Sequence, residues 1–441
     1  MSRKYLIDRL TSPVRKIAKE AKSGGIVLGI NVILALFLAN SPWKQDYFHF
    51  FEHHIGFQID GVSYLDYSLH HWINDGLMAV FFFMVGLELK REIVAGELSN
   101  PRKALLPIGA AIGGMIVPAF IYFCFNQNPE VHHGWGIPMA TDIAFALGVL
   151  YMLGDRVPLS LKVFLTALAI VDDLGAVLVI AFFYTTEISL THLGLGFALL
   201  FLIYLGRKIG IRNIWFYILF GLVVWGAFLL SGVHATIAAV LVAFMIPSDV
   251  ELHEKEFLRN IDSYLSKFRR LDPNHRIPTL TENQLLLLEN VAKDTRNAIP
   301  PLQRLEHALH PFVTFVVVPI FALANSGVTL SIKVDELFNT NVLLGVACGL
   351  FFGKVIGVVG STLLMIKLKL SPFPRGMNFI NLLGLGFLAA IGFTMSLFVT
   401  NLSFTHELHI NQAKIGIFIA SILGGVVAEA LVTSMILLFL V

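Results

Sequence analysis

Long apolar runs dominate this chain of 441 residues, and each is about as long as a helix must be to cross a bilayer, roughly 17 to 25 residues. We count twelve such runs, at residues 24–41, 70–89, 104–125, 135–153, 160–183, 190–206, 214–231, 233–247, 308–327, 341–366, 379–400 and 415–438. Only 14% of the residues are charged, compared with about 25% in soluble proteins. The sequence therefore predicts an all-α polytopic membrane protein with about twelve transmembrane helices, folded as a single domain over residues 1–441.

The basic residues lie almost entirely on one side of these segments. The N-terminal tail and the even-numbered loops carry 19 Lys and Arg residues, the opposite loops carry three, and the hydrophilic stretch 248–306 carries nine on the basic side. Because cytoplasmic loops retain positive charge, we expect both termini to be cytoplasmic. The first apolar run is long and has no convincing small-residue cleavage site, so no cleavable signal peptide is expected.

Two hydrophilic stretches lie between the apolar runs. On the outer side, residues 42–69 alternate aromatic and polar residues around Asp60 and Gly61, a pair typical of hairpin turns, and predict a periplasmic hairpin. On the inner side, residues 248–306 contain prolines and two amphipathic pieces, which predict an extended cytoplasmic loop and not a second domain. The net charge of +2 argues against nucleic acid as a partner.

Segments 4 and 11 contain residues that interrupt helices. Segment 4 reads Gly-Trp-Gly-Ile-Pro-Met-Ala-Thr-Asp over residues 134–142, and segment 11 contains Gly384, Gly386 and Gly392. Each is the middle member of a trio, segments 3–5 and 10–12, and the odd offset between the trios reverses the direction of crossing. This predicts inverted repeats whose broken helices 4 and 11 cross at the midplane and form an ion site. The alternative is that Gly and Pro are simply common in membrane helices.

Ionisable side chains occur inside the apolar runs. Four lie near the midpoints of their runs and two nearer the ends; they are Asp142, Asp172, Asp173 and Lys354, and then Asp75 and Glu429. A charge at the centre of a bilayer costs about 2.5 to 3.5 kcal/mol on insertion scales, so such residues face a protein interior or a wet cavity and usually mark a transport path. We therefore expect a protein that moves ions.

Asp172 and Asp173 are adjacent on one predicted helix and so point about 100° apart. One can coordinate a cation while the other meets a neighbouring side chain. The alternative is a static buried network, which would be an expensive way to hold a fold.

Asp142 and Thr141 lie where segment 4 is expected to unwind, and there a carboxylate can balance the positive ends of half-helices while free carbonyls bind a hard cation such as sodium. A helix cap without a transport role is the alternative. Lys354 lies in a row of glycines spaced by four, which would let segment 10 pack closely against a partner helix. We expect Lys354 to pair with an acid and favour Asp172, although that pair could be purely structural.

Several runs of this sequence resemble the signature segments of NhaA-type bacterial sodium/proton antiporters. The runs are Ala140-Thr141-Asp142-Ile143-Ala144-Phe145-Ala146, Val171-Asp172-Asp173-Leu174-Gly175-Ala176, Ser231-Gly232-Val233-His234-Ala235-Thr236, Gly86-Leu87-Glu88-Leu89-Lys90-Arg91-Glu92 and Phe352-Gly353-Lys354. The resemblance spans nearly the whole chain. Its fold, with inverted repeats and broken helices, is the one this family is known for.

The resemblance implies a transporter without enzymatic activity or cofactor, an electrogenic exchanger of sodium or lithium for protons in the bacterial inner membrane. It implies that Asp172 and Asp173 carry the cation and the protons, with Asp173 favoured as the direct sodium ligand and Asp172 as the partner of Lys354. By the same resemblance, Thr141 and Asp142 belong to the crossing. It also implies a homodimer joined partly by the 42–69 hairpin. The stretch 248–300 looks longer than in the best-known members of the family, which puts the regulatory geometry in doubt.

The resemblance further implies residues that respond to pH on the two sides of the membrane. On the inner side these are Glu88, Arg91, Glu92, Glu306, His307 and His310, and on the outer side His234. On the residues alone, charge at a membrane boundary is usually just solvated, and His234 reads more readily as a satisfied interfacial histidine.

Two other classes of protein place acids in membrane helices. An intramembrane aspartyl protease resembles a Gly-x-Gly-Asp pattern, whereas Asp142 and Asp172 follow Ala-Thr and Val. A sodium-coupled symporter for an organic acid would need an arginine at mid-depth, and none is evident. Exchange is the better reading, because protons and sodium would compete for the same buried carboxylates.

Overall fold

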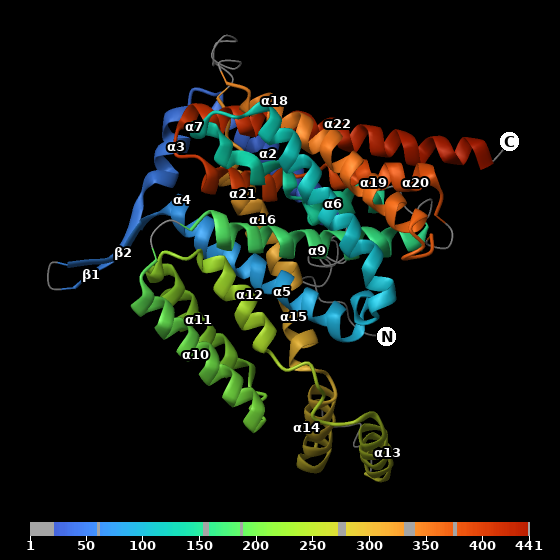
Figure 1. The fold of residues 1–441 in the computed structure, drawn as a ribbon. Helices are drawn as coiled ribbons and strands as arrows, with labels where there is room; N and C mark the ends of the chain where they lie inside the picture. Colours follow the sequence, from blue (N-terminus) through green and yellow to red (C-terminus); the bar gives the residue numbers. More distant parts are fainter. Residues whose placement is uncertain are drawn as a thin grey trace.

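The computed structural model describes residues 22–59, 62–152, 158–185, 188–271, 279–329, 340–373 and 377–439. Within these ranges nearly all of the chain is helical, and the long helices pack side by side in one bundle (Figure 1). A pair of strands and a pair of helices project from this bundle.

The twelve predicted segments are all helical in the structure. In order they are α2 (Lys22–Ala39); α4, η1 and α5 (Leu69–His71, Trp72–Leu77, Met78–Ala95); α6 (Pro101–Phe125); η3 and α8 (His133–Met139, Ile143–Met152); α9 (Leu159–Phe183); α10 (Leu190–Ile209); α11 (Ile214–Ser231); α12 (Ala235–Met245); α15, η5 and α16 (Pro301–Phe312, Val313–Val317, Val318–Asn325); α18, η6 and α19 (Val342–Cys348, Gly349–Gly353, Lys354–Lys367); α20 and α21 (Phe379–Ala389, Phe393–Ser403); and α22 (Glu407–Phe439). The short helices α3 (Lys44–Glu52), η2 (Glu97–Ser99) and α7 (Pro129–His132) lie in the connections.

Eight of the described helices are long and apolar enough to cross a membrane, and ten are if each of two bent pairs counts as one span. The other two predicted segments fall short for identifiable reasons. α12 has only 11 residues, and the inner end of α5 carries Glu88, Lys90, Arg91 and Glu92. The prediction of an all-α polytopic membrane protein is confirmed.

Segments 4 and 11 are broken where the sequence indicated. In segment 4, the 3-10 helix η3 ends at Met139, the backbone is extended at Ala140 and not helical through Asp142, and α8 begins at Ile143. In segment 11, α20 and α21 are bent by 43° around the break that contains Gly392. The breaks therefore fall in the middle members of the two predicted trios.

Glycines set the close packing between α6 and the helix formed by α18, η6 and α19. A Cβ atom added at Gly353 would lie 2.7 Å from Cα of Pro118, and one at Gly357 would collide with the carbonyl oxygen of Gly113. Small residues allow this approach of two backbones within a membrane. The glycine row thus lets the first helix of one trio, α6, pack closely against the first helix of the other, formed by α18, η6 and α19.

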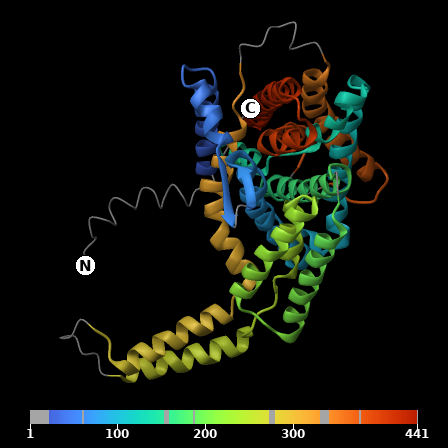
Figure 2. The ribbon, with the colours of Figure 1, turned by 90° about the vertical axis from the view of Figure 1, so that its left-hand side faces the viewer.

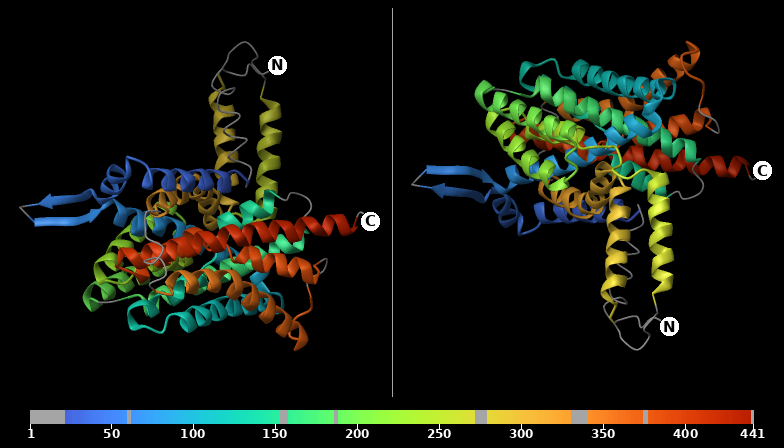
Figure 3. Two further views of the ribbon diagram at one scale, coloured as in Figure 1. Left: turned by 90° about the horizontal axis from the view of Figure 1, so that it is seen from above. Right: turned by 90° about the horizontal axis from the view of Figure 1, so that it is seen from below.

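The outer hydrophilic stretch forms a hairpin of β1 (His54–Ile59) and β2 (Val62–Ser68), which pair antiparallel. Figures 1 and 3 show it extending away from the helices. The predicted turn residues Asp60 and Gly61 lie outside the described residues.

The inner hydrophilic stretch forms two helices, α13 (Glu254–Arg270) and α14 (Glu282–Asn297), which pack against each other and which we call the arm. The backbone N–H groups of Glu251 and Leu252 both donate to the carbonyl of Asn297, at 3.0 and 3.1 Å, and so fasten its base. Figure 2 shows the arm extending sideways beyond the bundle.

The glycine packing generates a paired test. Gly357→Ala places a methyl group against the backbone of α6 and should lower the free energy of unfolding by about 1 to 3 kcal/mol, because overpacking forces the two helices apart. The matched change Gly360→Ala lies on the same helix with nothing within 4 Å and should shift stability by less than about 1 kcal/mol. Thermal melting of the purified variants in detergent measures both, and equal melting temperatures would contradict the packing argument.

Candidate functional site

The unwound residues of segments 4 and 11 bond directly to each other. The backbone N–H of Asp142 donates to the carbonyl of Ile391 at 2.7 Å, and the Thr141 hydroxyl donates to the carbonyl of Ala389 at 3.0 Å. These bonds satisfy polar backbone groups that the two breaks would otherwise leave unpaired inside the membrane. The crossing is therefore held by the residues that break the helices.

Asp142 caps two half-helices at once. Its Oδ1 accepts from the N–H of Phe145 at 2.9 Å, in the first turn of α8. Its Oδ2 accepts from the N–H of Thr394 at 3.0 Å and from the Thr394 hydroxyl, in the first turn of α21. A carboxylate at the N-terminus of a helix complements the positive end of the helix dipole, and this one serves two.

Lys354 pairs with Asp172. The Nζ atom of Lys354 bonds to Oδ2 of Asp172, and both side chains are 1% exposed. Lys354 is the first residue of α19, directly after the π-helical turn η6, and Asp172 lies midway along α9. The ion pair thus joins the last helix of the first trio to the first helix of the second.

Asp173 has the most unusual environment of the four mid-depth residues. It is 0% exposed, and neither of its carboxylate oxygens accepts a hydrogen bond from any residue that the structure describes. Nearly all buried polar groups in proteins have a partner, so an orphaned carboxylate calls for an explanation. Asp172, Asp142 and Lys354 all lie near enough to interact with its charge.

Three buried carboxylate oxygens on these adjacent residues therefore have no donor among the described residues, both oxygens of Asp173 and Oδ1 of Asp172. Hard cations take oxygen ligands, and carboxylates together with free carbonyls supply them. Among the described residues no group of three or more His, Cys, Asp or Glu side chains could hold a metal ion, so the two acids would need other oxygen ligands.

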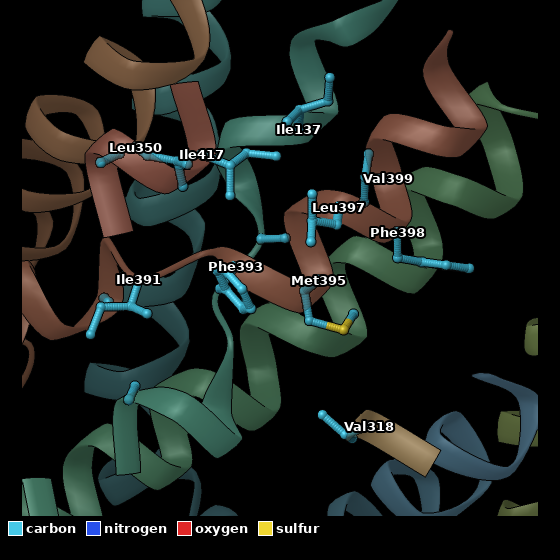
Figure 4. Close-up of a cluster of buried hydrophobic side chains, with 14 of the residues drawn as sticks. Ile137, Val318, Leu350, Ile391, Phe393, Met395, Leu397, Phe398, Val399 and Ile417 are labelled. Carbon is cyan, nitrogen blue, oxygen red and sulfur yellow. The ribbon is translucent and has the colours of Figure 1, made fainter. Parts of the chain in front are cut away.

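Apolar side chains surround the crossing. Figure 4 shows Ile137 of η3, Ile391 at the break of segment 11, Phe393 of α21, Leu350 of η6 and Ile417 of α22 gathered around it. Such a dry environment strengthens every electrostatic interaction within the site.

A cavity of about 310 Å³ lies between the predicted pH-response residues and the helices that carry the acids. Glu88, Arg91 and His310 line it, and so do Ile143 and Ile170. Ile143 directly follows Asp142, and Ile170 lies two residues before Asp172. The cavity therefore places part of the predicted pH-response group beside residues that neighbour the acids in sequence.

The structure brings most of that inner group together. Arg91 Nε lies 3.0 Å from Glu306 Oε1, and Arg91 Nη2 lies 3.1 Å from Glu92 Oε1. His307 is placed differently, because it lines a separate cavity beside the base of the arm with Arg296 and Arg304.

The remaining predicted residues lie apart from the acid site. His234 Nε2 lies 3.1 Å from the carbonyl of Tyr184, just beyond the outer end of α9. Asp75 Oδ2 lies 3.1 Å from His71 Nε2, and Glu429 is exposed on α22. Of the intramembrane acids, only Asp142, Asp172 and Asp173 belong to one site.

Sequence reasoning missed Thr394 as part of the site. Its hydroxyl and its N–H both donate to Asp142. Neither bond can be inferred from the sequence unless segments 4 and 11 are known to cross. The available signal was a threonine two residues after Gly392, which is where the first turn of a resumed helix would need a partner.

Comparison with known proteins identifies relatives over nearly the full chain. Residues 15–432 match the family described as Na+/H+ antiporter 1. The chain is 47% identical over 426 residues to Na(+)/H(+) antiporter NhaA 2 of Syntrophotalea carbinolica, covering 96% of each chain. It is 47% identical to Na(+)/H(+) antiporter NhaA of Oleidesulfovibrio alaskensis, covering 95% of this chain and 93% of the other, and 45% identical to that of Acidithiobacillus ferrooxidans, covering 94% and 95%.

The buried ion pair generates a stability test. Lys354→Met leaves the Asp172 carboxylate buried without its partner and should lower the free energy of unfolding by about 3 to 5 kcal/mol. Adding Asp172→Asn removes the unpaired charge and should restore more than half of the loss, because the two effects are coupled. Thermal melting in detergent compares the two variants. A double variant no more stable than Lys354→Met alone would show that the pair is not what stabilises this junction.

Proposed function

This chain belongs to the Na+/H+ antiporter 1 family, and on that premise we propose that it exports sodium ions in exchange for protons across the bacterial inner membrane. The observation that carries the proposal is Asp173, a fully buried carboxylate with no donor to either oxygen among the described residues. Such a group is suited to alternate between a bound cation and a bound proton. A purely structural acid would be expected to have donors, as Asp142 has.

The two adjacent acids, Asp172 and Asp173, have different roles in cation binding. Asp173 is the direct sodium ligand, and Asp172 contributes its free Oδ1 while its Oδ2 holds Lys354. Thr141 and Asp142 keep the crossing in place through their bonds to Ala389 and Ile391. Because a buried carboxylate is stable when it is either protonated or paired with a cation, protons and sodium compete for one site.

Competition between the two ions produces exchange. When the site opens to the cytoplasm, the acids release protons and bind sodium. After the two trios shift against the remaining helices, the more acidic outside displaces sodium with protons. If more than one proton moves per cation, each cycle transfers net charge, and the membrane potential drives it. Lithium, a smaller hard cation, is expected to use the same oxygens.

The inner cluster supports regulation by pH. Glu88, Arg91 and His310 line the cavity beside the helices that carry the acids, and Glu306 and Glu92 hold the Arg91 guanidinium. A change in the charge of this cluster would alter the field in this cavity. His307, beside the arm, and His234, on the outer side, would act from a distance.

The remaining features concern assembly and orientation. The distribution of Lys and Arg supports cytoplasmic termini and a cytoplasmic arm. The projecting β1–β2 hairpin has unpaired strand edges, and we propose that it pairs with the hairpin of a second copy in a homodimer.

Replacing Asp173 tests the exchange site. Asp173→Asn should abolish sodium-driven and lithium-driven proton movement in everted vesicles, because the neutral amide has no negative charge to hold a cation and no proton to exchange for it. The control is Glu429→Gln, an exposed acid on α22, which should retain exchange. Purified protein in vesicles should dissipate a pH gradient on addition of sodium alone. A requirement for an organic solute would favour symport instead, and exchange by Asp173→Asn would refute the assignment.

Changing the inner cluster tests the regulatory proposal. Glu306→Gln removes a negative charge beside Arg91, which makes proton release from neighbouring groups easier and should move the pH profile of exchange to lower pH by less than about one unit. Glu97→Gln is the control, because Glu97 forms only an exposed pair with Lys103 at 3.6 Å. Exchange rates across a pH series measure both. Identical profiles for Glu306→Gln and the unchanged protein would count against a role of this cluster in pH response.

A further inference from the structure

We propose that the arm is a membrane-surface element, which binds anionic phospholipid headgroups and inserts a face of leucines into the inner surface of the bilayer. This inference goes beyond ion exchange and rests on the proposed cytoplasmic position of the arm. It starts from exposed leucines. Leu258, Leu265, Leu285 and Leu288, which we call the leucine face, are 42 to 54% exposed although they lie on a segment outside the membrane bundle.

Three of the four leucines lie on one side of the helix pair. Leu258 and Leu265 are seven residues apart on α13, and Leu285 and Leu288 are three apart on α14, so each pair shares a face of its helix. The packed faces are marked by Asp294, which accepts from Asn260 at 2.9 Å and from Tyr264 at 3.2 Å. Measured around each antiparallel helix from that packed face, Leu258, Leu265 and Leu288 point to the same side, and Leu285 points away from α13.

A fifth exposed leucine gives a natural contrast. Leu286 is 59% exposed, yet the same helical geometry places it on the opposite side of the arm from Leu288. Leu286 therefore lies outside the leucine face and serves as the matched control position on the same helix.

The orientation of the arm and its point of attachment are those expected of a helix pair that lies on a membrane surface. Both views in Figure 3 show it running across the direction of the long helix α22, and Figure 2 shows it reaching sideways past the bundle. Its base is fastened where α12 ends and α15 begins, since Leu302 also donates its N–H to the carbonyl of Pro247 at 3.1 Å. An arm held at the inner ends of two spans and directed across them runs along the bilayer surface.

A cluster of basic residues marks the end of α13 and reaches the leucine face at Arg269. Lys267, Arg269 and Arg270 occupy the last turn of α13, and Arg269 lies four residues after Leu265, on the same face of the helix. An apolar stripe with Lys and Arg at its margins is the arrangement of helices that lie in the interface and attract anionic lipids. Because Asp262 lies between Leu258 and Leu265 on this face, the attraction to anionic phospholipid comes from the basic last turn of α13, and a second copy of the arm is tested as the other occupant.

The test places an environment-sensitive fluorophore on either side of the arm in the full-length protein. Leu288→Cys and Leu286→Cys are made separately in a Cys124→Ser/Cys348→Ser background, labelled, and reconstituted into vesicles with and without bromine-carrying acyl chains. Because an interfacial helix buries its apolar face about 5 to 10 Å into the boundary region, we expect the label at 288 to be quenched at least about twofold more than the label at 286. Replacing phosphatidylglycerol by phosphatidylcholine should reduce this difference.

Several outcomes would overturn the inference. Equal quenching at the two positions would remove the distinction between the faces, and quenching independent of lipid charge would exclude the headgroup contacts. Shielding of position 288 that depends on protein density and not on brominated lipid would assign the face to a second copy. Sodium-driven proton movement in the same vesicles separates the two proposals. Exchange without selective quenching contradicts only the arm, and selective quenching without exchange contradicts only the proposed function.

Discussion

The carboxylate of Asp142 is the interaction on which the rest of the site depends. Two broken helices bring two positive N-terminal ends into the middle of a membrane protein, where water is not available to solvate them. One side chain accepts bonds from the first turns of both α8 and α21, and its own N–H reaches across to Ile391. Without this cap, the breaks would leave several backbone groups unpaired, and a crossing of this kind could not persist.

Around this fixed centre the other charges differ in how firmly they are held. Asp172 has one oxygen paired with Lys354 and one without a donor, whereas neither oxygen of Asp173 has a donor in the part of the chain that the structure describes. Asp142 has donors to both oxygens, so the three carboxylates differ in their partners. That difference gives chemical meaning to three acids which a hydropathy profile records as equivalent.

Much of this arrangement could be predicted from the sequence, because its causes are local. Apolar length determines the spans, glycine and proline mark the breaks, and the cost of mid-depth charge singles out Asp142, Asp172, Asp173 and Lys354. What could not be predicted depends on contacts between distant segments. Thr394 reads as an ordinary residue of a helix until segment 4 is placed beside it. Likewise His307 and His310 look equivalent in sequence, yet they line different cavities.

The π-helical turn η6 explains how the glycine row stays aligned. In a regular α-helix, residues spaced by four drift about 40° around the axis at each step, so Gly345, Gly349, Gly353 and Gly357 would spiral away from a straight neighbour. The wider π-helical turn between Gly349 and Gly353 rotates each residue less around the axis and so compensates for the drift of one of these steps. The local irregularity thereby straightens a seam between two backbones, and the ammonium group that follows it emerges in register with its carboxylate.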